Sequence, residues 1–142
     1  MVRLDRTYPS VLESAEQLHV ELVDVLDSEQ VPPDMKQCFL LAVSEAATNA
    51  IIHGNRRDPH KKIYLSVLVN ESFLLADITD EGTDGLAKVS RRKVPDILSE
   101  NGRGVDLIKH YADAVTFEEA ANGGLKVSIR FDRSKANRTK QI

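Results

Sequence analysis

The spacing of hydrophobic positions changes early in the chain. Residues 2–8 alternate between apolar and polar side chains, which predicts a half-exposed edge strand. Over residues 12–26 the apolar positions recur at helical intervals instead. Ser10 followed by Glu13 has the spacing of a capping box. We therefore expect a strand followed at once by a helix whose N-terminus is capped by Ser10.

A second helix is expected after Val31-Pro32-Pro33. Pro33 or Asp34 can open it, because proline is tolerated in a first turn and an aspartate suits the positive end of the helix dipole. The helix runs to about Gly54, a natural C-terminal cap. Its centre line is apolar, so we expect the helix to be largely buried. This centre line consists of Phe39, Val43, Ala46 and Ala50.

The remaining pattern predicts strands, an irregular stretch, a short helix and a final hairpin. The expected strands cover residues 63–69, 73–79, 114–117 and 125–131, and the expected helix covers residues 104–112. Residues 82–101 have no clean period, and a loop of that length in a compact domain usually works as a lid or a binding loop. The order of elements predicts an α+β fold, a two-layer α/β sandwich with helices on one face of a mostly antiparallel mixed sheet.

Length and composition limit the class of protein. A chain of 142 residues fits one ordinary domain, and 42% hydrophobic with 29% charged residues is typical of a soluble globular protein. No stretch reaches the roughly 20 apolar residues of a membrane helix, and no apolar run follows the first basic residues as in a secretory signal. Cys38, the only cysteine, lies in an apolar run and is expected to be a small buried hydrophobe. We expect a cytoplasmic protein that does not bind a membrane.

The net charge of −3 is unevenly distributed. Residues 133–142 contain four basic and no acidic side chains, so residues 1–132 carry 15 basic against 22 acidic side chains, a net charge of −7. An acidic body repels phosphate backbones, so direct nucleic-acid binding is disfavoured. We expect an ordered domain over residues 1–132 and a basic, disordered tail over residues 133–142.

Three polar residues interrupt the second helix at intervals of four. Glu45, Asn49 and His53 therefore form one ridge along the flank of its apolar stripe. Burying a carboxylate and an amide costs several kcal/mol unless they find partners. A ligand groove along the ridge provides such partners, but capping or inter-helix hydrogen bonds do so too, and the spacing alone favours the second explanation.

Two glycine-containing segments are further candidates for ligand binding. Asp80-Glu81-Gly82 places a carboxylate at the end of a buried strand, where it can accept a hydrogen bond from an exocyclic amine such as that of adenine. Gly102-Arg103-Gly104 opens a helix, and backbone amides at a helix N-terminus hold phosphates. Each segment alone is also compatible with an ordinary turn.

Taken in order, these segments resemble the nucleotide-binding signature of the GHKL (Bergerat-fold) ATPase superfamily. Residues 45–53 are similar to its N box, and the two glycine segments are similar to its first and second glycine boxes. The other branches of the superfamily are much longer or carry a helical phosphoacceptor segment. The short chain, together with residues 49–55 and 99–104, most resembles the anti-sigma factor serine-protein kinases, also called anti-sigma regulatory factors.

The resemblance implies a role for each matching residue in binding ATP and Mg²⁺. Asn49 would hold Mg²⁺, Glu45 would act on the proton of the substrate hydroxyl, and Asp80 would select adenine. Gly82 would let the base approach the backbone. The phosphates would be held by Gly102, Arg103, Gly104 and Val105. His53 either lines the pocket or caps the helix.

Two positions depart from the pattern of the family. Asp84 occupies a place where many relatives have a second glycine, and Leu125 follows Gly124 where relatives often have threonine. The first departure concerns the hinge of the lid, and the second concerns a polar contact to the nucleotide.

The resemblance predicts an ATP-dependent anti-sigma factor. It would sequester a sigma factor, phosphorylate a serine or threonine of a STAS-domain antagonist, and form a homodimer. Two alternatives stay open: a nucleotide-gated binding module of the same fold without kinase activity, and a detached catalytic domain of the histidine-kinase type.

Overall fold

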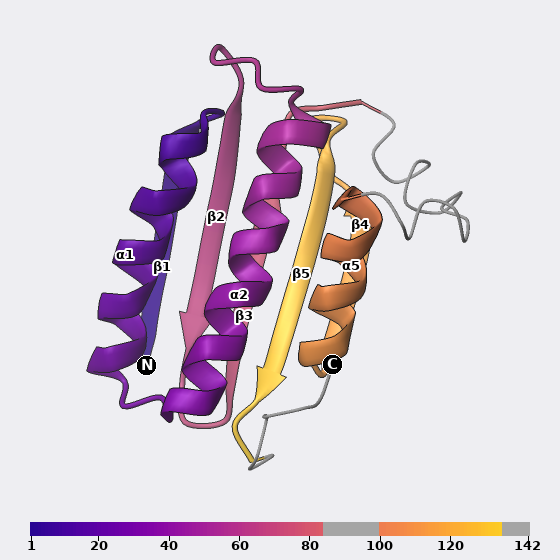
Figure 1. Cartoon of the computed structure of the whole chain (residues 1–142). Coiled ribbons are helices and arrows are strands. Elements are labelled where there is room, and N and C mark those ends of the chain that lie inside the picture. The colour runs from indigo at the N-terminus through magenta and orange to yellow at the C-terminus, as the bar shows by residue number, and fades with distance from the viewer. Residues whose placement is uncertain (84–99, 135–142) are drawn as a thin grey trace.

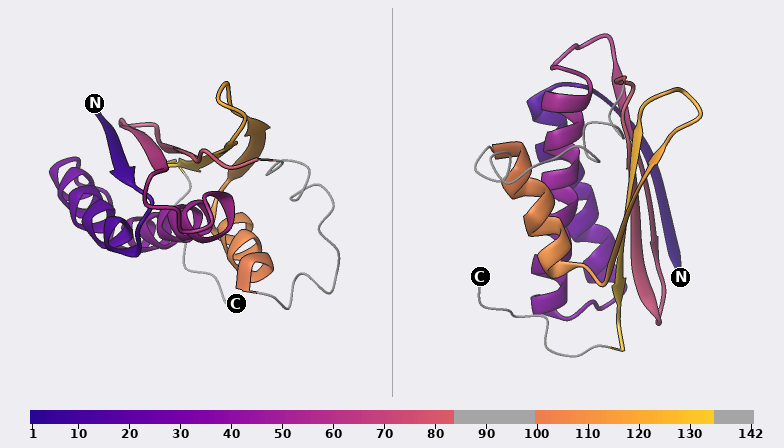
Figure 2. Two further views of the ribbon diagram at one scale, coloured as in Figure 1. Left: turned by 90° about the horizontal axis from the view of Figure 1, so that it is seen from above. Right: turned by 90° about the vertical axis from the view of Figure 1, so that its right-hand side faces the viewer.

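Three helices cover one face of a five-stranded sheet in the computed structural model of the chain (Figure 1). A view along the edge of the sheet shows that no helix of the described residues lies on its other face (Figure 2). The structure describes residues 1–83 and 100–134, and for residues 100–105 it describes the helix that they form but not their side chains. The predicted two-layer α+β sandwich is confirmed.

Every described strand pair is antiparallel, so the predicted predominance of antiparallel pairing is confirmed, and no parallel pair, as a mixed sheet would contain, is found among the described residues. The strands lie in the order β1-β2-β3-β5-β4, which makes β1 the edge strand that the alternation predicted. Their bounds are Val2–Pro9 for β1, Lys62–Val69 for β2, Phe73–Thr79 for β3, Ala114–Glu119 for β4 and Leu125–Asp132 for β5.

Helix α1 (Leu12–Ser28) packs beside α2 (Pro33–Asn49), and their apolar stripes face the sheet. The core between the layers includes Phe39 of α2 and Phe131 of β5, whose rings meet edge to face with centroids 5.3 Å apart. The predicted burial of the α2 centre line is confirmed, and Cys38 is also buried.

The capping box at the start of α1 is wrong. Val11 is the N-cap residue, and no side chain caps the helix. Ser10 instead extends the strand pairing, since its backbone N–H donates to Lys61 O at 3.0 Å. Its hydroxyl is fully buried and has no hydrogen-bond partner among the described residues. Pairing at the edge of the sheet therefore determines the conformation of Ser10, in place of the cap that the local sequence predicted.

Helix α2 does not continue as an α-helix to Gly54. Its last part, Ala50–Gly54, is a turn of π-helix labelled η1, closed by the Asn55 N–H that donates to Ala50 O at 2.8 Å. Residues in such a turn are hydrogen-bonded five apart rather than four, which a hydrophobic pattern cannot reveal.

Helix α5 (Glu100–Tyr111) begins two residues before Gly102, which was expected to open it. It lies beside α2 and completes the helical layer. Arg133, which was placed in the tail, is held to the body, because its guanidinium donates to Asn70 O at 2.9 Å and to Glu29 O at 3.3 Å. Most of the expected lid (residues 84–99) and most of the expected tail (residues 135–142) lie outside the described residues. No described helix is long and apolar enough to cross a membrane.

Candidate functional site

Asp80 lies directly after β3 and is the most deeply buried acidic residue that the structure describes, with 4% of its surface exposed. Its Oδ1 accepts hydrogen bonds from the backbone N–H groups of Gly82 at 2.9 Å and Leu125 at 3.0 Å. No described residue donates a hydrogen bond to Oδ2. Burying a carboxylate is costly, and one of its two oxygens is left available for an outside donor.

Gly54 and Gly124 pack against Asp80, and Gly82 packs against Gly54. A Cβ atom on Gly54 would overlap Asp80 Oδ2 and lie 2.5 Å from its Cγ. A Cβ on Gly82 would lie 2.8 Å from the carbonyl carbon of Gly54, and one on Gly124 would lie 2.8 Å from Asp80 Oδ1. Only residues without a side chain fit at these distances. We call Asp80 with Gly54, Gly82 and Gly124 the glycine cradle.

Asn55 connects three segments at the cradle, a role that the sequence pattern did not predict. Its side chain is fully buried: Nδ2 donates to Lys62 O at 2.9 Å, and Oδ1 accepts from the Glu81 N–H at 2.7 Å. The Glu81 carboxylate in turn accepts from the Lys62 N–H at 2.6 Å and from the Tyr64 hydroxyl at 3.1 Å. The hydrogen bond to Glu81 raises the pKa of Tyr64 above its ordinary value. These bonds fix the end of β3 against η1 and β2.

Two residues of the predicted polar ridge, Glu45 and Asn49, lie on α2, and the third, His53, lies in the π-helical turn η1, so only the first two keep the α-helical spacing that predicted the ridge. Glu45 and Asn49 are half-buried, and His53 is exposed in η1. None of their side chains makes a hydrogen bond or ion pair within the part of the chain that the structure describes. The inter-helix hydrogen bonds that the spacing alone favoured are therefore not found there, and the carboxylate and amide are available to a ligand.

The second glycine segment lies in the first turns of α5. Gly102, Arg103, Gly104 and Val105 belong to the residues whose side chains are not described. Because α5 packs along α2, this end of α5 is at the same end of the molecule as η1 and the β4–β5 turn (Figure 1). Asp84, the departure at the lid hinge, lies outside the described residues. Leu125, the other departure, contributes its backbone N–H to Asp80.

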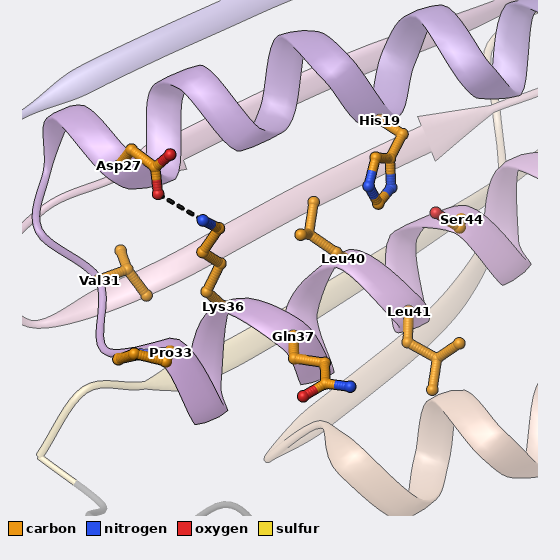
Figure 3. Close-up of a pocket in the computed structure, with 9 residues that line it drawn as sticks. All are labelled: His19, Asp27, Val31, Pro33, Lys36, Gln37, Leu40, Leu41 and Ser44. Carbon is orange, nitrogen blue, oxygen red and sulfur yellow. Dashed lines mark hydrogen bonds and ion pairs between the residues drawn. The ribbon is translucent and has the colours of Figure 1, made fainter.

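The largest groove for which a lining is described lies elsewhere. It has a volume of about 540 Å³ and runs between α1 and α2 on the outer face of the helical layer (Figure 3). His19 and Ser44 lie near one end, and the ion pair between Lys36 and Asp27 lies near the other. None of the predicted site residues lines it. Among the described residues there is also no group of three His, Cys, Asp or Glu side chains that could hold a metal ion by themselves.

Known proteins share this combination of sheet, helices and sequence. Residues 8–131 match the family of histidine kinase-like ATPase domains, and the chain belongs to that family. A histidine kinase domain from the blue-light activated histidine kinase of Erythrobacter litoralis has the same fold, with a TM-score of 0.53 at 16% identity. That comparison covers 89% of this chain but only 62% of the other.

The relatives narrow the family to one branch. An anti-sigma F factor of a Geobacillus species is 34% identical over 116 residues, which are 75% of this chain and 79% of the relative. The anti-sigma F factor of Oceanobacillus iheyensis is 31% identical over 114 residues, with coverages of 75% and 77%. The chain thus belongs to the anti-sigma factor branch of the histidine kinase-like ATPases.

Proposed function

We propose that this chain is an ATP- and Mg²⁺-dependent anti-sigma factor that phosphorylates a serine or threonine of a STAS-domain antagonist and sequesters a sigma factor. The observation that carries the proposal is the glycine cradle. It holds a buried carboxylate of which Oδ1 accepts two hydrogen bonds and Oδ2 accepts none from the described residues. The cytoplasm is the proposed location, and a homodimer is the proposed assembly.

The cradle fits the base of ATP. Asp80 Oδ2 accepts a hydrogen bond from the exocyclic amine of adenine, while Oδ1 stays bonded to two backbone N–H groups. Gly82, beside Asp80, is the proposed position at which the flat base approaches the backbone. A base with a carbonyl in place of the amine brings two acceptor oxygens together, so the same site disfavours it.

Asn49 fits a magnesium site that is completed by phosphates. Its amide oxygen is a hard ligand, and Mg²⁺ is usually held by one or two protein groups together with substrate phosphates and water. The lack of a cluster of three ligands among the described residues agrees with such a partial site. Mg²⁺, when bound, neutralises charge on the phosphates. His53, which follows in η1, is the proposed border of the cofactor-binding site.

Glu45 lies one helical turn from Asn49 on the same ridge and is the proposed catalytic base. The hydroxyl oxygen of the antagonist bonds to the γ-phosphorus, the bond to the β–γ bridging oxygen breaks, and ADP leaves. Glu45 takes the hydroxyl proton. The phosphates are the proposed ligands of Gly102, Arg103, Gly104 and Val105 at the start of α5.

The partners in this proposal come from the relatives, which are named anti-sigma F factors. A sigma factor is the target that this name implies. A STAS-domain antagonist is the proposed phosphate acceptor. Direct nucleic-acid or membrane binding is not part of the proposal.

Asp80→Asn tests the cradle, with Asp77→Asn as the matched control from the same strand. Asp77 lies on the open face of the sheet, 3.8 Å from Lys126 Nζ, and takes no part in the proposed site. We expect Asp80→Asn to weaken ATP binding about 10- to 100-fold, because a charge-assisted hydrogen bond is lost. Asp77→Asn should bind ATP as the unmodified chain does. Equal affinities of both variants for ATP would refute the assignment.

Glu45→Ala separates binding from transfer in a kinase assay with purified antagonist. ATP should still bind, and phosphate transfer should fall about 100-fold or more. Undiminished transfer contradicts the role of Glu45. If the unmodified chain binds ATP but transfers no phosphate, the binding-module alternative replaces the kinase. Acid-labile phosphohistidine on the acceptor, in place of acid-stable phosphoserine or phosphothreonine, identifies the histidine-kinase alternative.

A further inference from the structure

The loop between η1 and β2 carries a concentrated positive charge. Residues 56–62 contain two arginines, two lysines and a histidine, and only one acidic residue. We call the side chains of Arg56, Arg57, Lys61 and Lys62 the basic loop patch. Three of the four are exposed, and Lys61 is half-buried. His60, also exposed, adds a positive charge when it is protonated.

These four cations differ from the other basic side chains that the structure describes. None of the four makes an ion pair, a side-chain hydrogen bond or a cation–π contact with a described residue. Every other described lysine or arginine side chain has such a partner. The pairs are Arg3 with Asp5, Arg6 with Glu21, Lys36 with Asp27, Lys126 with Asp77 and Glu118, Arg130 with Asp132, Lys109 with the Phe117 ring, and Arg133 with backbone carbonyls.

The loop that presents the patch is held by hydrogen bonds at several points. Asn55 joins its two ends, Asp58 N–H donates to Asn55 O at 3.0 Å, and Lys61 O accepts from the Ser10 N–H at 3.0 Å. The Asp58 carboxylate takes part in a turn of the loop, where its Oδ1 accepts the His60 N–H at 2.9 Å, and it forms no ion pair with a described cation. The backbone that carries the cations is therefore preorganised, which reduces the entropy cost of ordering the loop on binding.

Two arginines adopt backbone conformations that favour glycine or asparagine. The φ angles of Arg56 and Arg57 are 53° and 58°, in the left-handed region that ordinary side chains rarely occupy. Stability alone gives no reason for arginine at these positions, and neighbouring like charges repel one another. A functional role of the two arginine side chains, and not the stability of the fold, therefore explains these residues.

We propose that the basic loop patch is a docking surface for an acidic segment of a partner protein. A run of a few carboxylates matches four cations within one short loop. A nucleic acid is a poorer match, because its phosphates would extend beyond the loop and lie over the acidic remainder of the domain. Residues 1–132 carry a net charge of −7, which repels phosphates. The nucleotide itself does not neutralise the patch in the proposed binding mode, because its base lies at Asp80 and its phosphates at α5.

This inference goes beyond the proposed function and holds whether or not the chain transfers phosphate. The patch adjoins the cradle through Asn55 and through the bond between Lys62 and Glu81. An acidic segment docked there would lie at the rim of the proposed nucleotide site, where it would set the orientation of a protein substrate.

The test compares two double variants of equal charge. Arg56→Gln/Arg57→Gln removes two patch cations, and Arg3→Gln/Lys126→Gln removes two paired cations elsewhere on the surface. A short polyglutamate peptide and a DNA duplex of equal charge are titrated against the unmodified chain and both variants at about 50 mM salt. We expect the patch variant to bind the peptide about tenfold more weakly, and the control variant to change the affinity less than about twofold.

Three outcomes overturn the proposal. The first is an equal loss of peptide affinity in both variants, or no loss in either. The second is tighter binding of the DNA than of the peptide through the same arginines, which makes the patch a nucleic-acid site. The third is a parallel loss of ATP affinity in the patch variant, which assigns the cations to the nucleotide. A chain that binds no ATP at all refutes the proposed function but leaves the peptide comparison valid.

Discussion

Replacing Gly54 by alanine tests the glycine cradle directly. Gly54 does not have a positive φ, so alanine is conformationally allowed, and any cost comes from the contact with Asp80. The new Cβ would overlap Asp80 Oδ2 and lie 2.5 Å from Cγ and 3.1 Å from Cβ of the same residue. Asp80 must then move, or η1 must move away from β3.

The magnitude follows from the bonds that such a movement breaks. Asp80 Oδ1 accepts two charge-assisted hydrogen bonds, at 2.9 and 3.0 Å, each of which contributes about 1.5–3 kcal/mol. Partial loss of both, with the usual cost of overpacking and the gain from a stiffer unfolded chain, lowers the free energy of unfolding by about 3 kcal/mol. ATP affinity should fall as well, since the carboxylate is displaced.

Urea denaturation followed by far-UV circular dichroism measures this loss, with Gly123→Ala as the control. Gly123 has a φ of 89° and no heavy atom within 4 Å of a built Cβ, so alanine there costs about 1 kcal/mol for its conformation only. Adding Asp80→Ala to Gly54→Ala removes the overlapping atoms, so the two costs should not add. Full additivity, or a Gly54→Ala variant as stable as the control, would refute the cradle.

Three further predictions concern the packing around the site and the first helix. Asn55→Ala removes a fully buried side chain that bonds the Lys62 carbonyl and the Glu81 N–H, and it should cost about 2–4 kcal/mol in the same denaturation assay. The more exposed turn bonds lost in Asn70→Ala are replaced by water, so that variant should lose less than about 1.5 kcal/mol. Ser10→Ala should be neutral or stabilising in thermal melts, because it removes a buried hydroxyl that has no partner in the described part of the chain. A loss of about 1 kcal/mol would instead support the capping box. Tyr8→Phe removes the 2.7 Å hydrogen bond from the Tyr8 hydroxyl to Glu21 and should lower the free energy of unfolding by about 1 kcal/mol at pH 7. Burial, together with that bond, raises the Tyr8 pKa far above its ordinary value of 10.0, so the unmodified chain loses stability as the pH rises above 10. The difference in unfolding free energy between the two proteins should therefore narrow above pH 10.

The periodicity of the sequence was sufficient to predict the elements and the buried faces. The positions that repeat at helical intervals in α1 and α2 are the ones that pack on the sheet, since burial of an apolar stripe is what stabilises a surface helix. Alternation likewise predicted the strands, with β1 at the edge. These features depend on residues close together in sequence, so a single sequence is enough to predict them.

The features that were missed depend on partners distant in sequence. The hydrogen bonds between Ser10 and Lys61, between Arg133 and Glu29, and between Asn55 and Glu81 form only when the sheet brings these residues together. Of these, Asn55 carried a weak signal, because an asparagine directly after Gly54 at the end of an apolar helix often takes a special conformation or a backbone hydrogen bond. The pairing that makes it essential to the site is not visible in the sequence.

Asp80 stabilises the fold through Oδ1 and is proposed to bind the ligand through Oδ2. Its backbone N–H donates to Leu125 O at 3.1 Å and its Oδ1 accepts the Leu125 N–H, so it extends the pairing of β3 and β5 beyond Thr79. Any substitution that removes Oδ1 therefore destabilises this end of the sheet. Asparagine can keep its carbonyl oxygen toward the two N–H groups and turn its amide toward Gly54, where an acceptor is needed only by the ligand. Asp80→Asn therefore changes the Oδ2 position, which serves ligand binding, and keeps the Oδ1 contacts, which serve stability. For this reason it is more informative than Asp80→Ala.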